Sequence, residues 1–137
     1  MKLSFALLAA ITLLCPPRYD EDSDSELKYR LYRYETENVA NPDSVAIRTA
    51  LFFLGTPYAT ASLEVPEKEE LVVNLDQLDC VTFVENYLAL YRTSVSDGTW
   101  CGYLGELQNI RYRGGVVDGY CSRLHYTSDW IYDNCRM

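Results

Sequence analysis

A cysteine at the predicted start of a helix is the residue in this 137-residue chain best suited to nucleophilic chemistry. Asp79-Cys80 comes directly before an apolar pattern of helical spacing, which places Cys80 in the first turn of a helix. The helix dipole and the unpaired N–H groups of a first turn favour a thiolate. The same N–H groups can stabilise the oxyanion formed when an amide carbonyl is attacked. The alternative is that Cys80 is a small apolar residue filling the core beneath the helix.

The helix that would position this cysteine carries an apolar stripe that also includes Cys80. The spacing i, i+3, i+4, i+7, i+8, i+11 predicts that the stripe faces the core, and Ser96-Asp97-Gly98 ends the helix. Besides Cys80, the members of the stripe are Phe83, Val84, Tyr87, Leu88 and Tyr91.

The remaining patterns predict a mostly helical chain. A first helix begins at Glu26, and a second occupies about 42–54, with Asn41 as its N-cap and Gly55 as its stop. Residues 71–75 are predicted as a short strand or extended segment, 100–110 as a weaker helix, and Ser128 as the cap of a last short helix. The apolar repeats of the first two helices are Leu27, Leu31 and Tyr34, and Ile47, Ala50, Leu51 and Leu54.

The N-terminus has the order of an export signal. Lys2 precedes an apolar run over residues 3–14, and Pro16-Pro17 follows, so residues 1–15 are predicted as a signal peptide and 16–25 as a linker. The alternative is a buried N-terminal helix. The protein is expected outside the cytoplasm, in the periplasm or the extracellular space. Cys15 is placed where a lipoprotein is acylated, so a membrane anchor is expected only if Cys15 is lipidated; simple cleavage is the alternative.

Composition and charge narrow the function classes. The apolar fraction of 48% fits one globular domain, and the net charge of −8 argues against a nucleic-acid binder, which needs a basic face. In an oxidising compartment Cys80, Cys101, Cys121 and Cys135 could pair in three ways, and at most one bridge forms if Cys80 is a working thiol. The spacing is not that of a zinc site, so no metal and no cofactor are expected.

Four segments in order resemble one family. They are Gly55-Thr56-Pro57-Tyr58, Asp79-Cys80, the run Ile-Arg-Tyr-Arg-Gly at 110–114, and 122–131, which contains Ser-Arg-Leu-His-Tyr and Asp-Trp-Ile. Together they resemble the N-acetylmuramoyl-L-alanine amidase-like branch of the NlpC-type papain-like cysteine peptidases, over about residues 42 to 135. The resemblance implies an α+β papain-like fold, represented mainly by its N-terminal helical half, with little or no complete sheet. Residues 26–137 would form this partial domain.

The resemblance also implies a reaction and roles for two residues. The reaction is hydrolysis of amide bonds in peptidoglycan, with stem peptides or muropeptides as substrates. Cys80 would be the nucleophile, and its N–H and the Tyr58 hydroxyl would lie near the oxyanion, because a phenol is a neutral donor at pH 7. The alternative for Tyr58 is a packed turn tyrosine. The strand bearing the family's base histidine is not found after Cys80, so an isolated chain is expected to be marginally stable and poorly active.

Three further residues are candidates for substrate binding or for an alternative base. His125 is a cleft residue, a structural histidine packed near Tyr126 and Trp130, or the catalytic base. Arg123 could bind a stem-peptide carboxylate through its guanidinium, or be solvated or pair with a helix. Asp79, beside the nucleophile, is the third candidate.

Two function classes follow from these residues. The first is a thiol amidase or endopeptidase of the cell wall, impaired as a fragment. The second is a non-catalytic exported binding module whose cysteines are structural or disulfide-bonded. An accessible Cys80 favours the first, and a Cys80 locked in a disulfide favours the second.

Overall fold

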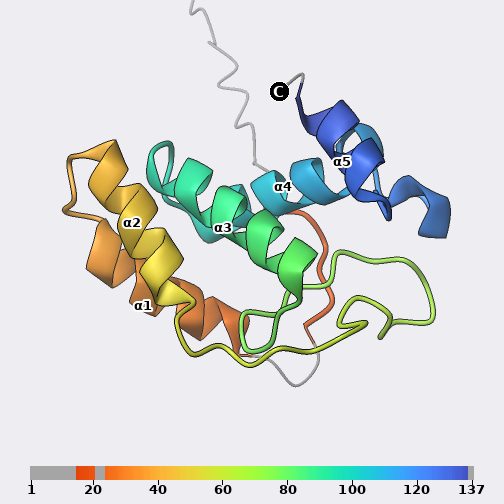
Figure 1. The fold of residues 1–137 in the computed structure, drawn as a ribbon, viewed down its shortest axis with the longest axis horizontal. Coiled ribbons are helices and arrows are strands. Elements are labelled where there is room, and N and C mark those ends of the chain that lie inside the picture. Colours follow the sequence, from red (N-terminus) through yellow and green to blue (C-terminus); the bar gives the residue numbers. More distant parts are fainter. Residues whose placement is uncertain (1–14, 21–23, 136–137) are drawn as a thin grey trace, which may run out of the picture.

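Helices packed around α3 and α4 form the protein in a computed structural model that describes residues 15–20 and 24–135. Figure 1 shows α3 and α4 side by side at the centre, with α1 and α2 on one side and α5 at the other end. Between residues 15–20 and 24–135, pairing of extended backbone is limited to isolated bridges, so the expected mostly helical chain without a complete sheet is confirmed. The helices are α1 (Ser25–Thr36), α2 (Pro42–Phe52), α3 (Cys80–Ser94), α4 (Trp100–Arg111) and α5 (Thr127–Asn134), with short 3-10 turns η1 (Arg113–Gly115) and η2 (Tyr120–Ser122).

The helix starts follow local capping chemistry. Asn41 Oδ1 accepts hydrogen bonds from the N–H groups of Asp43 and Ser44, and Pro42 takes the first helical position, so the predicted start of α2 is confirmed. The helix bearing Cys80 also starts where predicted, at Cys80. The predicted cap of α5 is wrong, because the helix begins at Thr127 and Ser128 lies inside its first turn.

The buried face of α3 is mainly polar and packs against α4. It can be buried because its polar groups are paired. Asn86 Nδ2 donates to the Thr82 carbonyl at 2.7 Å, and Asn86 Oδ1 accepts from the hydroxyl of Tyr103 on α4. The buried residues of α3 are Thr82, Glu85, Asn86, Ala89, Leu90 and Thr93.

Most of the apolar stripe of α3 lies on the other side, so the prediction that it faces the core is wrong for Cys80, Phe83 and Val84. It is confirmed for Tyr87 and Leu88, which are partly buried and pack against the core. Cys80 is exposed, Val81, Phe83 and Val84 keep 37–40% of their surface, and Tyr87, Leu88 and Tyr91 are half-buried. The apolar repeats of α1 and α2 also point outward; Leu31, Ile47 and Leu54 are 56%, 61% and 83% exposed. Tyr29 and Tyr32 of α1, and Val45 and Phe53 at α2, supply the core instead. Tyr32 can be fully buried because its ring packs in the core while its hydroxyl contacts the hydroxyls of Thr49 and Ser94.

The segment before α1 is attached to the fold. The Tyr19 N–H donates to the Leu71 carbonyl at 2.9 Å, and the Val73 N–H donates to the Tyr19 carbonyl at 3.0 Å. The predicted extended segment 71–75 is therefore confirmed as extended backbone, and its Leu71, Val72, Val73 and Leu75 side chains are buried. Part of the expected linker 16–25 thus packs on the domain. The predicted signal peptide lies outside the described residues, apart from Cys15.

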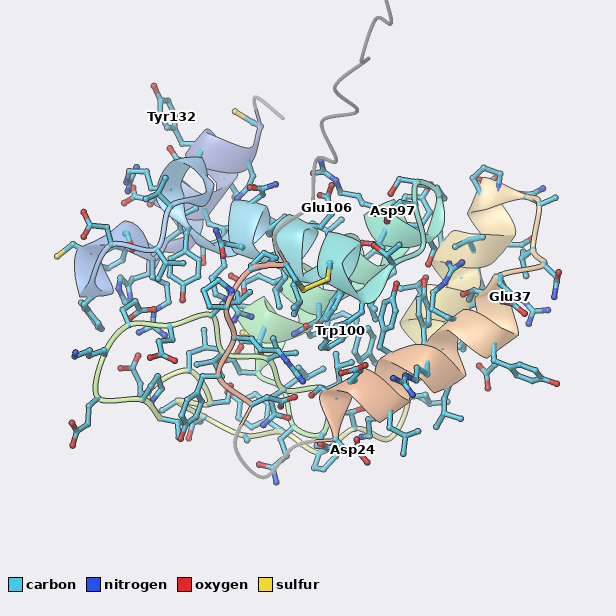
Figure 2. The ribbon with its side chains drawn as sticks, turned by 180° about the vertical axis from the view of Figure 1, so that it is seen from behind. Asp24, Glu37, Asp97, Trp100, Glu106 and Tyr132 are labelled. Carbon is cyan, nitrogen blue, oxygen red and sulfur yellow. A yellow bond between two sulfur atoms is a disulfide. The ribbon has the colours of Figure 1, made fainter. Side chains whose placement is uncertain are left out.

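A disulfide between Cys15 and Cys101 joins this segment to α4. Figure 2 shows it near Trp100, and the Arg18 guanidinium lies 4.9 Å from the Trp100 ring. The expectation that pairing is confined to the four later cysteines is wrong, because Cys101 pairs with Cys15 at a sequence separation of 86. Within the described ranges, no helix is long and apolar enough to cross a membrane.

Candidate active site

Cys80 occupies the first helical position of α3, and Asp79 caps the helix. Asp79 Oδ1 accepts from the N–H groups of Val81 and Thr82 at 3.0 and 2.7 Å, and the Thr82 hydroxyl accepts from the Asp79 N–H at 2.8 Å. This reciprocal capping box fixes the first turn. Among the described residues no acceptor takes the N–H of Cys80, so this donor is available beside the exposed thiol. Asp79 thus has a structural use, and its expected part in substrate binding or as a base stays a prediction.

A first hollow of about 230 Å³ brings Cys80 and Tyr58 together; we call it the tyrosine hollow. The backbone around Tyr58 runs beside the backbone that leads into α3. Leu78 donates to the Pro57 carbonyl and Ala59 donates to the Leu78 carbonyl, both at 3.1 Å. Tyr58 is 70% exposed, so it is not the packed turn tyrosine of the alternative interpretation. The lining residues are Phe53, Thr56, Tyr58, Leu78, Asp79, Cys80 and Phe83.

A second hollow of about 280 Å³ lies on the other side of Cys80; we call it the apolar hollow. His125 lines it, so the structure brings this histidine and the cysteine to one cavity. His125 Nε2 is 2.7 Å from the Tyr120 carbonyl oxygen, and the two rings lie 4.0 Å apart. Because a carbonyl oxygen only accepts, Nε2 is the donor in this hydrogen bond. The lining residues are Cys80, Val81, Val84, Leu124, His125, Thr127, Trp130 and Ile131.

Arg123 lies away from both hollows and is paired inside the protein. Its guanidinium contacts the carboxylates of Glu64 and Glu69 and lies 5.3 Å from the Tyr120 ring. The side chain is 5% exposed. A substrate carboxylate would have to compete with these internal partners, so substrate binding by Arg123 stays a prediction.

The buried pair Glu85–Arg111 was not found from the sequence. Glu85, on α3, accepts from Arg111 Nε at 2.7 Å, and Arg111 also donates to the Val72 carbonyl. Burial lowers the pKa of Arg111, but the attraction and hydrogen bond of Glu85 outweigh burial and leave that pKa raised. The pair joins α3, α4 and the extended segment behind Cys80. A clue was present: Arg111 lies at helical spacing from Leu104 and Leu107, on the buried face of α4.

Tyr112 reinforces the same junction. Its hydroxyl lies 2.8 Å from both Glu69 Oε1 and the Glu70 carbonyl oxygen, and these two acceptors share its single proton. Burial and the hydrogen bond to Glu69 raise the pKa of this phenol, which therefore stays protonated. In the part of the chain that the structure describes, no three His, Cys, Asp or Glu side chains gather to hold a metal ion. The arrangement therefore offers a thiol, a free backbone N–H and a phenol at one helix start.

Comparisons with known proteins identify a family for most of the chain. Residues 48–137 match the AmiA-like, N-acetylmuramoyl-L-alanine amidase-like family. A solved N-acetylmuramoyl-L-alanine amidase from Bacteroides uniformis is 40% identical, with a TM-score of 0.64 over 69% of this chain and 40% of that one. A provisionally named xylanase from Bacteroides fragilis is 45% identical, with a TM-score of 0.62 over 64% of this chain and 38% of that one.

A more distant structure, from Legionella pneumophila, is 25% identical with a TM-score of 0.67, covering 82% of this chain and 37% of that one. No curated protein matches the chain. The chain thus spans about two fifths of the length of the solved structures that it resembles. Since the family match extends over most of the chain and includes Cys80 and Tyr58, the chain belongs to the AmiA-like, N-acetylmuramoyl-L-alanine amidase-like family.

Proposed function

We propose that this chain carries the nucleophile-bearing part of a peptidoglycan amidase or endopeptidase, with Cys80 as the nucleophile. The observation that carries the proposal is the position of the Cys80 thiol. It is exposed and free of disulfides at the first position of α3, in one hollow with Tyr58. The family name supports an amide of the cell wall as the substrate. The binding-module alternative is disfavoured, because the disulfide joins Cys15 and Cys101 and leaves Cys80 reduced.

The proposed reaction proceeds through a thioester. The Cys80 sulfur attacks the amide carbonyl carbon, a C–S bond forms, and the carbonyl electron pair moves to oxygen. The Cys80 N–H and the Tyr58 hydroxyl donate to this oxyanion. Collapse of the oxyanion breaks the C–N bond, and the amine leaves with the proton that the Cys80 thiol gave up to the general base. Water then hydrolyses the thioester, which releases a carboxylate and restores the thiol.

The described residues do not provide a well-placed general base for this mechanism. His125 lines the same hollow as Cys80, but its Nε2 is held by the Tyr120 carbonyl. We therefore assign His125 to the cleft wall, and propose that the base of a papain-like (NlpC-type) site comes from outside the described residues. On this proposal the chain by itself forms the acyl-enzyme from activated esters, whose leaving group needs no proton, better than from amides.

The paired-carboxylate chemistry of a glycosidase fits the site less well. Such enzymes need two carboxyl groups flanking the bond that is cut. Asp79 is the one carboxylate among the residues lining the two hollows at Cys80, and its Oδ1 caps α3. The thiol therefore remains the better-supported reacting group.

Acylation of Cys80 tests the proposal. The chain is mixed with a p-nitrophenyl ester of an N-acyl alanine, and peptide mass spectrometry follows the acyl group on each free cysteine. We expect Cys80 to be acylated at least about tenfold faster than Cys135, and Tyr58→Phe to slow Cys80 by about tenfold or more, because one oxyanion donor is lost. His125→Gln distinguishes a wall residue from a base, because slowing of Cys80 acylation as large as that caused by Tyr58→Phe would make His125 the base. Cys121→Ser is the matched control, because Cys121 is also a free and exposed thiol, and it should leave the rate of Cys80 acylation unchanged. Equal acylation of Cys80 and Cys135 would rule out an activated nucleophile.

We also propose that the protein is exported. The Cys15–Cys101 disulfide requires an oxidising compartment, which agrees with the apolar N-terminal run. In this disulfide Cys15 stays in the chain and has no thiol left to acylate. The disulfide therefore excludes both a lipid anchor on Cys15 and removal of all of residues 1–15 as a signal peptide, and it agrees only with cleavage before Cys15. Intact mass of the protein from its native compartment, under non-reducing conditions, distinguishes these three forms.

A further inference from the structure

Two apolar repeats with the pattern of core positions lie on the surface of the hairpin formed by α1 and α2. In each repeat, three large apolar side chains follow one another at i, i+4 and i+7, which is the spacing of a helix that buries one face. These six side chains nevertheless keep between 49% and 83% of their surface. We call this surface the hairpin face; its members are Leu27, Leu31 and Tyr34 of α1, and Ile47, Leu51 and Leu54 at α2.

The two helices of the hairpin are held together by contacts behind this face. The Tyr32 hydroxyl lies 2.7 Å from the Thr49 hydroxyl, and the ring centroids of Tyr32 and Phe52 are 5.2 Å apart. One turn later, Arg48 Nη1 donates to the Glu35 carbonyl at 3.3 Å. Figure 1 shows α1 and α2 side by side, at the opposite end of the molecule from α5. The position of one repeat relative to the other is therefore fixed by the fold.

A crease of about 470 Å³ between the two helices joins the repeats into one patch. Ile47 and Leu51 line the crease from α2, and Glu35 lines it from α1. Leu31 is one turn before Glu35 on the same side of α1, so it borders the crease as well. Both repeats thus meet there, together with the carboxylate of Glu35 and the guanidinium of Arg48.

The hairpin face has the area of a stable protein–protein interface. Its six side chains together expose roughly 700 Å², as their exposed fractions indicate, and a standard interface buries about 800 Å² on each partner. The largest apolar patch on a monomeric protein is usually about 300–600 Å² and is often a binding site. The hairpin face is therefore larger than the apolar surface that a monomer ordinarily leaves exposed.

Charge favours a second copy of the chain as the occupant. The chain has a net charge of −8, but residues 26–54 contain four basic and four acidic side chains and so contribute none of it. Two copies that meet through their hairpin faces keep their acidic remainders apart. Because Glu35 and Arg48 both line the crease, each copy also presents both signs of charge to the other. An anionic membrane, in contrast, gains no net attraction from a balanced surface.

We propose that the hairpin face is the interface of a homodimer in which two copies of the chain are related by a two-fold axis. The four helices of the two hairpins then form one bundle, in which the apolar repeats of one copy pack against those of the other. The family match begins at residue 48, so α1 and the first half of α2 lie outside it. The dimer is therefore independent of the chemistry proposed for Cys80.

Sedimentation equilibrium measures the dimer. The chain is used with its Cys15–Cys101 disulfide intact and with its free thiols blocked by N-ethylmaleimide, so that no new disulfide can join two copies. We expect a monomer–dimer equilibrium with a dissociation constant in the micromolar range, the weak end for an interface of this area. A chain that stays monomeric up to about 200 μM would overturn the proposal.

Substitutions on each helix locate the interface. Leu31→Gln and Leu51→Gln introduce another good helix former of similar size but make the face polar. Each should raise the dissociation constant at least about tenfold, because a two-fold axis brings every substitution into the interface twice. Circular dichroism confirms that both variants are folded.

Val116→Gln is the matched control for Leu51→Gln. Both residues are 59% exposed, and Val116 lies between η1 and η2, outside the hairpin face. This variant should leave the dissociation constant unchanged. An increase as large as that caused by Leu51→Gln would mean that association is not specific to the hairpin face, and would overturn the proposal.

Hydroxyl-radical footprinting checks the interface without any substitution. Tyr34 is 79% and Tyr126 73% exposed, so their rings are matched targets. As protein concentration is raised, the oxidation rate of Tyr34 should fall at least about threefold and that of Tyr126 should stay constant, because residues inside an interface lose access to solvent. Protection of Tyr126 in place of Tyr34 would overturn the proposal in favour of another interface. Protection of Tyr34 by anionic phospholipid vesicles, but not by added protein, would overturn it in favour of a membrane.

Discussion

The two faces of α3 differ in a way that the hydropathy of its residues does not suggest. The inward face carries Glu85, Asn86 and two threonines, and each of these is hydrogen-bonded. The outward face carries valines and aromatic rings, and Cys80 begins it. The inward face is thus specialised for fixing the helix against α4, while the outward face offers apolar surface around the thiol. The comparison indicates that a polar face can be the structural one when every polar group has a partner.

Breaking the inward face at Glu85 should have the largest effect. Glu85→Ala leaves the Arg111 guanidinium buried without its carboxylate, so we expect a loss of about 3–5 kcal/mol in the free energy of unfolding. Urea denaturation followed by circular dichroism measures the loss.

The matched control joins the same two helices at the surface. Arg92 of α3 and Glu106 of α4 are paired at 2.9 Å with side chains 41% and 26% exposed, so Glu106→Ala should cost less than about 1 kcal/mol. Similar losses for the two variants would mean that the buried pair does not anchor α3.

The second-largest effect is expected from alkaline pH, which should lower the free energy of unfolding through the buried tyrosines. Burial raises the pKa of Tyr103 and of Tyr29 above the ordinary value of 10.0, and burial with the Glu69 hydrogen bond does so for Tyr112. Above pH 10 the unfolded chain loses phenol protons that the folded chain keeps. Stability therefore falls as pH rises, by about 1.4 kcal/mol per pH unit for each such tyrosine.

Urea midpoints between pH 8 and 11 measure this slope. Tyr103→Phe removes one of the three phenols and should flatten it, although the variant also loses the hydrogen bond to Asn86 and so starts from a lower stability at pH 8. A midpoint that stays level from pH 9 to 11 would argue against three buried phenols.

The sequence was most informative where the controlling contact is local. Asn41 and Asp79 each cap a helix through N–H groups two and three residues away, and both starts were predicted. The inward face of α3 was mispredicted because its partner Arg111 is 26 residues from Glu85, and periodicity carries no information on pairing at that distance. The Cys15–Cys101 disulfide was not predicted for the same reason, because its two cysteines are 86 residues apart in the sequence.

The candidate site divides in a similar way. The pairing of Tyr58 with Cys80 was expected from the resemblance of short motifs, and the two residues do line one hollow. That His125 joins Cys80 in a second hollow, while Arg123 is engaged by Glu64 and Glu69, depends on how three separate segments pack. Spacing along the chain could name these residues but could not assign them to one cavity or another.

The smallest loss of stability is expected for a valine-to-threonine substitution on the outward face of α3. The same substitution at a buried valine gives the comparison. Val84 is 40% exposed and Val73 is 1% exposed. Threonine has nearly the shape of valine, so Val84→Thr places a hydroxyl where water can solvate it, and the free energy of unfolding should change by no more than about 0.5 kcal/mol. Val73→Thr buries the same hydroxyl beside Leu71 and Leu75 and should cost about 1–3 kcal/mol.

Urea denaturation of both variants compares them directly, and sedimentation at increasing concentration should show less self-association for Val84→Thr, since exposed apolar area is reduced. If Val84→Thr instead cost as much as Val73→Thr, the outward face would be part of the core after all.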